Sequence, residues 1–232
     1  MINFSKIMKK AFTLSEVLLV VGIIGLVSAL TIPNVNRGVN EEKFAVLFRS
    51  TIDQLNAAQG KLLSEYGSIE NATSDCANNK QVCYGNKLVN YLDVAVNCTN
   101  TDSTRCFLNS DMFEIDGSGS FRDSGGYSFV LQNGACVYIR VFDQPRIAGV
   151  DVDLDGPNKG PNRKGYDIFV LHINLDLYFE PVNNQRNKVM NADGALRINS
   201  DYDFYSEWLY NYGNMDYLKC PNELNWVKKH SC

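Results

Sequence analysis

One run of alternating carboxylates in this chain has the spacing of a metal-binding segment. Asp151, Asp153 and Asp155 are separated by single apolar residues. On an extended backbone alternate side chains point to the same side, so these charges repel one another unless a cation neutralises them. Calcium takes about six to eight oxygen ligands, which carboxylates, amides and main-chain carbonyls supply. The candidate calcium ligands are Asp151, Asp153, Asp155, Asn158, Asn162 and Asp167.

The same segment also fits a solvated acidic turn that needs no metal. Lys159, Arg163 and Lys164 could neutralise the carboxylates, and Asp and Asn side chains commonly cap backbone amides in turns. The spacing resembles the first half of an EF-hand loop, but Asn162 stands where that loop has its last glutamate. The segment is therefore not an EF-hand, and calcium stays the single cofactor that the sequence suggests.

A second unusual carboxylate, Glu16, stands at the start of an apolar run near the N-terminus. Residues 17–32 contain no charged side chain. A carboxylate at membrane depth costs about 2.5–3.5 kcal/mol on insertion scales and normally finds a partner. Cleavage between Ala11 and Phe12 would create an α-amine at Phe12, about one helical turn before Glu16. That amine, on the same chain or on a neighbour, would be the partner that Glu16 needs.

Two other interpretations of this N-terminus remain open. In the first it is an ordinary signal peptide, with Lys6, Lys9 and Lys10 as its basic region and residues 27–29 as its cleavage site. In the second it is an uncleaved anchor, although residues 17–32 fall short of the roughly 20 apolar residues that a spanning helix needs. A glutamate inside the apolar region is a poor feature for a signal peptide.

The N-terminal motif resembles that of type IV prepilins and type II secretion pseudopilins. It combines two lysines, the small residue Ala11, then Phe12, Glu16 at the fifth position of the cleaved chain, and an apolar core that Pro33 follows. The family usually has glycine where this chain has Ala11. The resemblance covers about residues 6–66 and implies that a prepilin peptidase removes a leader of residues 1–11.

The resemblance further implies that Phe12 is N-methylated and that Glu16 pairs with the Phe12 amine of a neighbouring subunit in a filament core. The implied partners are other pilin or pseudopilin subunits, the prepilin peptidase and methylase, an inner-membrane assembly platform, and membrane lipid before assembly. The implied location is the inner (cytoplasmic) membrane, crossed once with the head outside the cytoplasm. After assembly it would be a periplasmic or cell-surface filament.

Composition agrees with an exported protein that has one globular head. Three of the 22 basic residues lie in the leader, so the cut chain has 19 basic against 26 acidic side chains and a net charge of −7. This acidic balance disfavours nonspecific nucleic-acid binding, and no nucleic-acid partner is predicted. With two histidines and none of the common catalytic motifs, the sequence predicts that the protein is not an enzyme.

Seven cysteines in a chain with an export signal indicate disulfides formed in an oxidising compartment. Proximity in sequence suggests three pairs, each closing a short loop: Cys76 with Cys83, Cys98 with Cys106, and Cys220 with Cys232. This leaves Cys136 in a strand. The last pair resembles the C-terminal disulfide loop of many pilins.

Apolar side chains at helical spacing predict a long N-terminal helix over residues 12–66, with residues 12–32 in the membrane or filament core and 41–66 packed on the head. Such a helix would be about 80 Å long. Residues 67–106 read as a connecting loop stapled by disulfides. Alternation of apolar and polar side chains then predicts strands at 112–115, 127–132, 135–141, 166–173 and 175–179, with a hairpin turn at Asn133-Gly134.

The expected fold is therefore α+β, a pilin-like, disulfide-stapled head of residues 67–232 whose antiparallel sheet packs on the long helix. A cluster of tyrosines and tryptophans after residue 190 fits either packed core or a recognition surface.

The head is large for a main repeating pilin, which favours a minor pilin or pseudopilin of a type IV pilus-like or type II secretion filament. The alternative is a membrane-anchored, calcium-dependent extracellular binding module that does not polymerise.

Overall fold

The structure is a computed structural model that describes residues 13–76, 80–98, 112–121, 126–140, 149–156, 159–173, 179–181 and 204–232. For residues 28–40, 120–121, 140 and 180 it describes the backbone alone. The chain divides into two compact units, Met1–Asn40 and Glu41–Cys232. The expected leader, with Ala11 and Phe12 at its cleavage site, lies outside the described residues.

Helix α1, Leu14–Tyr66, is the longest element and has the helical character that its apolar spacing predicts. Its backbone is helical through Pro33, whose side chain is outside the described part. It ends at Tyr66, and the next residue, Gly67, has φ +77°, the left-handed conformation that glycine adopts readily just after a helix C-terminus. No stretch of helix among the described residues is both long enough and apolar enough to cross a membrane.

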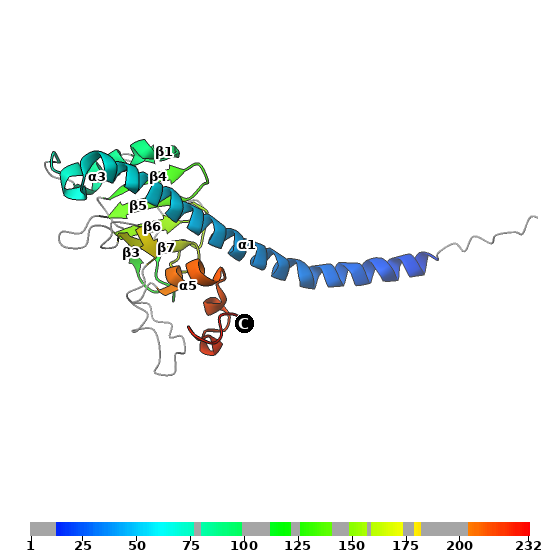
Figure 1. The fold of residues 1–232 in the computed structure, drawn as a ribbon. Helices are drawn as coiled ribbons and strands as arrows, with labels where there is room; N and C mark the ends of the chain where they lie inside the picture. The colour runs from blue at the N-terminus through cyan, green and yellow to red at the C-terminus, as the bar shows by residue number, and fades with distance from the viewer. Residues whose placement is uncertain are drawn as a thin grey trace, which may run out of the picture. The chain divides into compact units, whose positions relative to one another are not determined.

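The head unit contains a six-stranded antiparallel sheet in the order β1-β4-β5-β6-β7-β8 (Figure 1). Its strands are β1 Val94–Cys98, β4 Tyr127–Leu131, β5 Cys136–Arg140, β6 Gly149–Asp153, β7 Ile168–Ile173 and β8 Phe179–Pro181. A small separate sheet pairs β2 Met112–Phe113 with β3 Ser120–Phe121. The predicted α+β class and antiparallel sheet are confirmed.

Short helices complete the described part of the head: α2 Ile69–Ala72, α3 Lys80–Leu88 and α5 Phe204–Tyr212, with 3-10 turns η1 Val89–Tyr91, η3 Asp216–Leu218 and η4 Pro221–Glu223. The region expected to be a connecting loop, residues 67–106, thus contains α2, α3 and β1, so that expectation was wrong. Helix α3 is held by packing, since Tyr84 and Leu88 are buried and the Tyr84 hydroxyl donates to Gln59 Oε1 at 2.6 Å.

The core forms where the C-terminal half of α1 crosses the sheet (Figure 1). The ring of Phe48 on α1 lies 5.2 Å from that of Phe169 on β7. The buried apolar positions of α1 repeat every three or four residues, as a helix packed on one face requires, and are Ala45, Phe48, Ile52, Leu55, Ala58 and Leu62. Burying each large apolar side chain contributes about 1.5–3 kcal/mol, so this stripe fixes the segment from residue 41 onward to the head.

Strands β4 and β5 form the predicted hairpin. Tyr127 pairs with Ile139 and Val130 with Cys136, and the turn contains Gly134 at φ +91°. Only glycine and, less readily, Asn or Asp adopt that conformation, which is why Asn133-Gly134 predicted the turn from sequence. The last predicted strand, 175–179, lies almost wholly outside the described residues, and β8 begins at its final residue.

Two of the three predicted disulfides are confirmed, Cys76–Cys83 and Cys220–Cys232. Cys98 is also disulfide-bonded, and its predicted partner Cys106 lies outside the described residues. Cys136 carries a buried thiol on β5, whose pKa is raised well above the usual value by burial and by the nearby Asp153 carboxyl.

The aromatic residues near the C-terminus are mainly packed core. Trp208, Tyr205 and Tyr217 are almost wholly buried, and Trp208 meets Trp226 edge-on with ring centroids 4.9 Å apart. Tyr210 is an exception at 37 % exposure. Within the described residues the packed-core interpretation of this cluster is therefore confirmed.

Candidate functional site

The first turn of α1 is closed by reciprocal hydrogen bonds between Thr13 and Glu16. The Thr13 backbone N–H and its hydroxyl each donate to Glu16 Oε2 at 2.8 Å. The Glu16 backbone N–H donates back to Thr13 Oγ1 at 3.3 Å. This is a capping box, which satisfies backbone donors that have no partner inside the helix. Sequence reasoning assigned Glu16 to an amine and missed this bond, although Thr-x-x-Glu is the usual signal for it.

The same end of α1 exposes apolar side chains around its whole circumference. Five consecutive residues, 17–21, are each 48–65 % exposed, and consecutive residues point to different sides of a helix. The exposed large apolar side chains here are Leu14, Val17, Leu18, Leu19, Val20, Val21, Ile23, Ile24, Leu26 and Val27. A helix that is apolar on all sides is normally buried in lipid or protein, so this surface needs a covering.

The acidic segment begins on β6, which places Asp151 and Asp153 on the same side of the sheet. Both carboxylates are fully buried, as is that of Asp167 just before β7. Asp167 accepts hydrogen bonds from the backbone N–H groups of Asn162 and Arg163, both at 2.7 Å. Asp153 Oδ1 accepts from those of Asp155 at 3.2 Å and Gly156 at 2.9 Å. The aspartates therefore order the loop between the two strands.

Three of the predicted ligands, Asp153, Asp155 and Asp167, interact electrostatically. Burial, then repulsion from Asp167 and Asp155, raises the pKa of Asp153 to about 8. Burial, together with the Asp155 charge, raises the pKa of Asp167 to about 6, although hydrogen bonds from backbone amides, chiefly those of Arg163 and Asn162, oppose the shift. Burial also raises the pKa of Asp155, whose side chain shares a hydrogen bond with Asp153. Two carboxyls that share a hydrogen bond need one proton or one cation between them.

The donor chemistry of this segment fits a hard cation. Its side chains offer oxygen only, and Asp155 Oδ1 is buried without a hydrogen bond from the described residues. Asn162, at φ +52°, is also buried beside Asp167, whereas Asn158 lies outside the described residues. The side-chain oxygens of the aspartates do not all lie within 4.8 Å of one another, so they do not form a complete coordination shell.

The cations expected to neutralise these aspartates are mostly engaged elsewhere. Lys164 Nζ donates to Glu114 at 3.0 Å, and the Arg163 guanidinium lies over the Tyr166 ring, 5.0 Å from its centroid. Lys159 is close enough to favour the charged form of Asp155, which lowers the pKa of that carboxyl against the effect of burial. Among the described residues, the metal-free interpretation thus has Lys159 and, with a smaller effect, Lys43 as the cations that act on Asp155.

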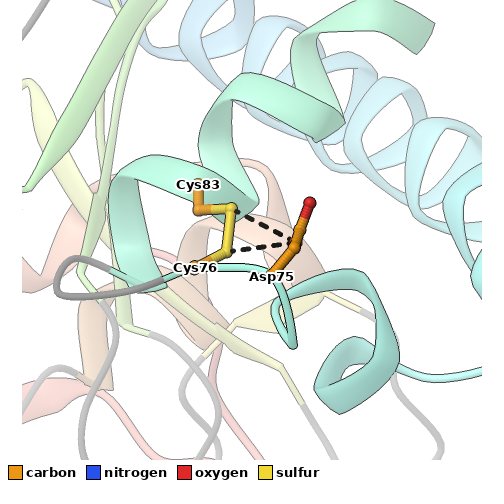
Figure 2. Close-up of side chains that lie close together, drawn as sticks. All are labelled: Asp75, Cys76 and Cys83. Atoms are coloured by element: carbon orange, nitrogen blue, oxygen red, sulfur yellow. Dashed lines mark hydrogen bonds between the residues drawn. A yellow bond between two sulfur atoms is a disulfide. The ribbon is translucent and has the colours of Figure 1, made fainter.

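A different cluster, Asp75, Cys76 and Cys83, has ligand atoms within 4.8 Å of one another (Figure 2). Its two sulfurs form a disulfide and lie 3.6 and 3.9 Å from Asp75 Oδ1. A disulfide contains no thiolate, which is the form of cysteine that binds metals. The cluster is therefore a structural cross-link. Lys87 completes it, donating to Asp75 Oδ1 and to the Ala72 carbonyl, each at 2.6 Å, and lowering the pKa of Asp75.

Neither histidine of the chain stands in a recognisable catalytic arrangement among the described residues. His230 stacks on Tyr212 with ring centroids 4.0 Å apart, and His172 lies half-buried on β7 opposite Gly149 and Glu180. The absence of enzyme activity stays a prediction. Comparison of the chain with protein families, with curated proteins and with solved structures gives no match.

Proposed function

We propose that this protein is a structural subunit, a minor pilin or pseudopilin, of a type IV pilus-like or type II secretion filament. The observation that carries the proposal is the helix end that begins at the Thr13–Glu16 capping box and exposes apolar side chains on every side. Fully burying each such side chain is worth about 1.5–3 kcal/mol, so this surface strongly favours lipid or neighbouring helices over water.

Glu16 supports assembly through the same surface. Its Oε2 accepts both bonds that Thr13 donates, and the second carboxylate oxygen, Oε1, can accept from a neighbour. The α-amine of a neighbouring Phe12 is a suitable donor, because an ammonium and a carboxylate pair strongly where water is excluded. Such a pair would set the register of one subunit against the next.

Processing and location follow from the N-terminal motif. The chain would be cut between Ala11 and Phe12 by a prepilin peptidase and methylated on Phe12. It would wait in the inner membrane, in contact with lipid and the assembly platform, with Pro33 just beyond the apolar run. The confirmed disulfides support a head outside the cytoplasm, since disulfides persist mainly in oxidising compartments.

The test is the N-terminus and intact mass of the protein purified from the membranes of its own host. A chain that begins at methylated Phe12 is the expected result. A chain that begins at Leu30, after a signal-peptide cut, or an unprocessed Met1 would each contradict the proposal, because neither leaves a free Phe12 amine near Glu16.

The buried carboxylates favour a second candidate, in which the protein is an anchored, calcium-dependent binding module. Calcium would be held by Asp153, Asp155 and Asp167 with oxygen from Asn162, and it would supply the positive charge that these side chains need. Calcium binding alone is compatible with either function. Sedimentation of filaments from the host separates them, because a module that does not polymerise stays with the membrane whether calcium is present or chelated.

A further inference from the structure

The turn that joins β4 to β5 contains the single Asn-Gly pair of the sequence, Asn133-Gly134. Both residues are exposed. Asparagine is a chemically labile residue, and a following glycine has no Cβ to hinder a reaction between its main-chain nitrogen and the asparagine Cγ. The pair therefore has the composition of a spontaneous modification site, and neither the acidic segment nor the apolar end of α1 includes it.

The reaction is intramolecular and needs only water as a second reactant. The Gly134 main-chain nitrogen, after losing its proton, bonds to Cγ of Asn133. The bond from Cγ to Nδ2 then breaks, and Nδ2 takes up a proton and leaves as ammonia. Water opens the resulting succinimide ring at either of its two carbonyls, which gives aspartate or isoaspartate. In isoaspartate the main chain runs through the side chain and is longer by one methylene.

In the folded hairpin both reacting groups are held by hydrogen bonds. The Gly134 N–H donates to the Leu131 carbonyl at 2.9 Å. Asn133 Oδ1 accepts from the Ala135 N–H at 3.0 Å, and Asn133 Nδ2 donates to Thr51 Oγ1 on α1 at 3.3 Å. Thr51 is fully buried, so this contact ties the turn to a fixed point of the core. The Gly134 nitrogen must leave the Leu131 carbonyl before it can react, which requires the turn to open locally.

We propose that Asn133 is a site of spontaneous deamidation and isoaspartate formation, and that its hydrogen bond to Thr51 limits the rate. The new carboxylate would lie beside the acidic segment, since the Gly134 carbonyl oxygen is 3.7 Å from the position of a Cβ on Gly156. Isoaspartate would also lengthen the short turn that sets the β4–β5 register. The inference does not depend on the proposed filament function.

The first experiment incubates the full chain, in detergent at pH 8, and measures the modified fraction by mass spectrometry after digestion at low pH, where the reaction is slow. Asn133 is expected to gain the mass difference between an amide and a carboxylate, and an isoaspartyl methyltransferase should methylate the product. The internal control is Asn222, an exposed asparagine before Glu223, which should react much more slowly. Urea should speed the reaction at Asn133, because unfolding removes the hydrogen bonds of the turn.

The second experiment tests the contact with α1. T51V removes the hydroxyl and keeps the shape of the side chain, so it should raise the rate at Asn133 about fivefold, the factor that corresponds to a hydrogen bond worth about 1 kcal/mol. The matched control is T51S, which keeps the hydroxyl and should react at the wild-type rate. The comparison with urea uses the wild-type chain and stands even if T51V does not fold.

Three results would overturn the proposal. They are a rate at Asn133 no higher than that at Asn222, a rate that urea leaves unchanged, and equal rates in T51V and T51S.

Discussion

Lys219 Nζ lies 2.9 Å from a carboxylate oxygen of Glu41, and this ion pair joins the C-terminal disulfide loop to the first residue of the head unit. Lys219 also contacts Asp216 Oδ1 at 2.9 Å, and Asp216 Oδ2 accepts from the Cys232 backbone N–H at 2.9 Å. A chain of polar contacts therefore runs from α1 to the last residue, beside the Cys220–Cys232 disulfide.

Replacing Lys219 with methionine should lower the free energy of unfolding of the head by about 1 kcal/mol, because the partly buried Glu41 carboxylate and the buried Asp216 carboxylate lose their shared cation. Urea denaturation followed by tryptophan fluorescence measures this. The matched control is K229M, which breaks an exposed pair with Glu223 and should cost less than about 0.5 kcal/mol. Equal effects of the two changes would show that the Glu41 contact does not stabilise the head.

Glu16→Gln and Glu16→Ala should both abolish assembly, because both remove the charge that would pair with a neighbouring Phe12 amine. Glutamine can still accept from Thr13, so the first turn of α1 keeps its cap in E16Q and loses it in E16A. The control T13A keeps the charge and loses the hydroxyl cap, which costs about 1 kcal/mol and should reduce filaments only partly. Electron microscopy and the sheared surface fraction measure filament yield.

Normal filaments in E16Q would mean that Glu16 works as a helix cap and that its charge has no part in assembly. Intact Cys76–Cys83 and Cys220–Cys232 disulfides in each variant, measured by mass spectrometry, show that the head has folded. Loss of these disulfides together with loss of filaments would assign the defect to export or folding.

The sequence predicted those parts of the fold that local pattern determines. Phe48, Ile52 and Leu55 recur at helical spacing and Asn133-Gly134 specifies a hairpin turn, so the packed half of α1 and the β4–β5 pair could be foreseen. Helix α3 could not, because its Lys80–Leu88 sequence has few apolar residues and depends on the contact of Tyr84 with α1 and on a disulfide. Propensity is a weak guide where tertiary contacts decide.

The candidate sites likewise have some features that local sequence pattern predicts and others that depend on tertiary contacts. Alternation on a strand correctly put Asp151 and Asp153 on one side, but the approach of Asp167 to Asp153 depends on the pairing of Asp153 with Ile168 across β6 and β7. The spacing of residues within one segment does not determine this register between β6 and β7. The head also contains a pocket lined by Asp53 of α1, Phe179 of β8 and Glu207 of α5, and because it joins three distant segments only the assembled fold could reveal it.

In calcium-free buffer with a chelator, Asp153 should make the head less stable as pH rises from about 4 to about 8. Its pKa is raised to about 8 in the folded protein, so the native state keeps a proton that the unfolded chain has already released. Raising pH through this window therefore favours the unfolded chain. The measurement is the free energy of unfolding against pH, taken as wild type minus D153N to cancel the titrating groups that do not interact with Asp153.

Asparagine at position 153 can still accept from the Gly156 backbone N–H, so D153N removes the titration and keeps the turn. The difference between wild type and D153N should fall with increasing pH. A difference that rises with pH would mean that the Asp153 carboxylate is stabilised in its charged form, against the effect of its burial.

Calcium should reverse that pH effect if the acidic segment binds it. At pH 8 an ion between Asp153, Asp155 and Asp167 would replace the shared proton and remove their mutual repulsion. Stability should then rise with calcium concentration, by about 2.7 kcal/mol at a hundred times Kd, and Tm should fall again on chelation. D153N and D155N should lose most of this shift, whereas D93N should keep it. If the wild-type Tm changes with neither calcium nor chelator, the calcium hypothesis is wrong. The segment is then a solvated acidic turn in which Lys159 is the main neutralising cation.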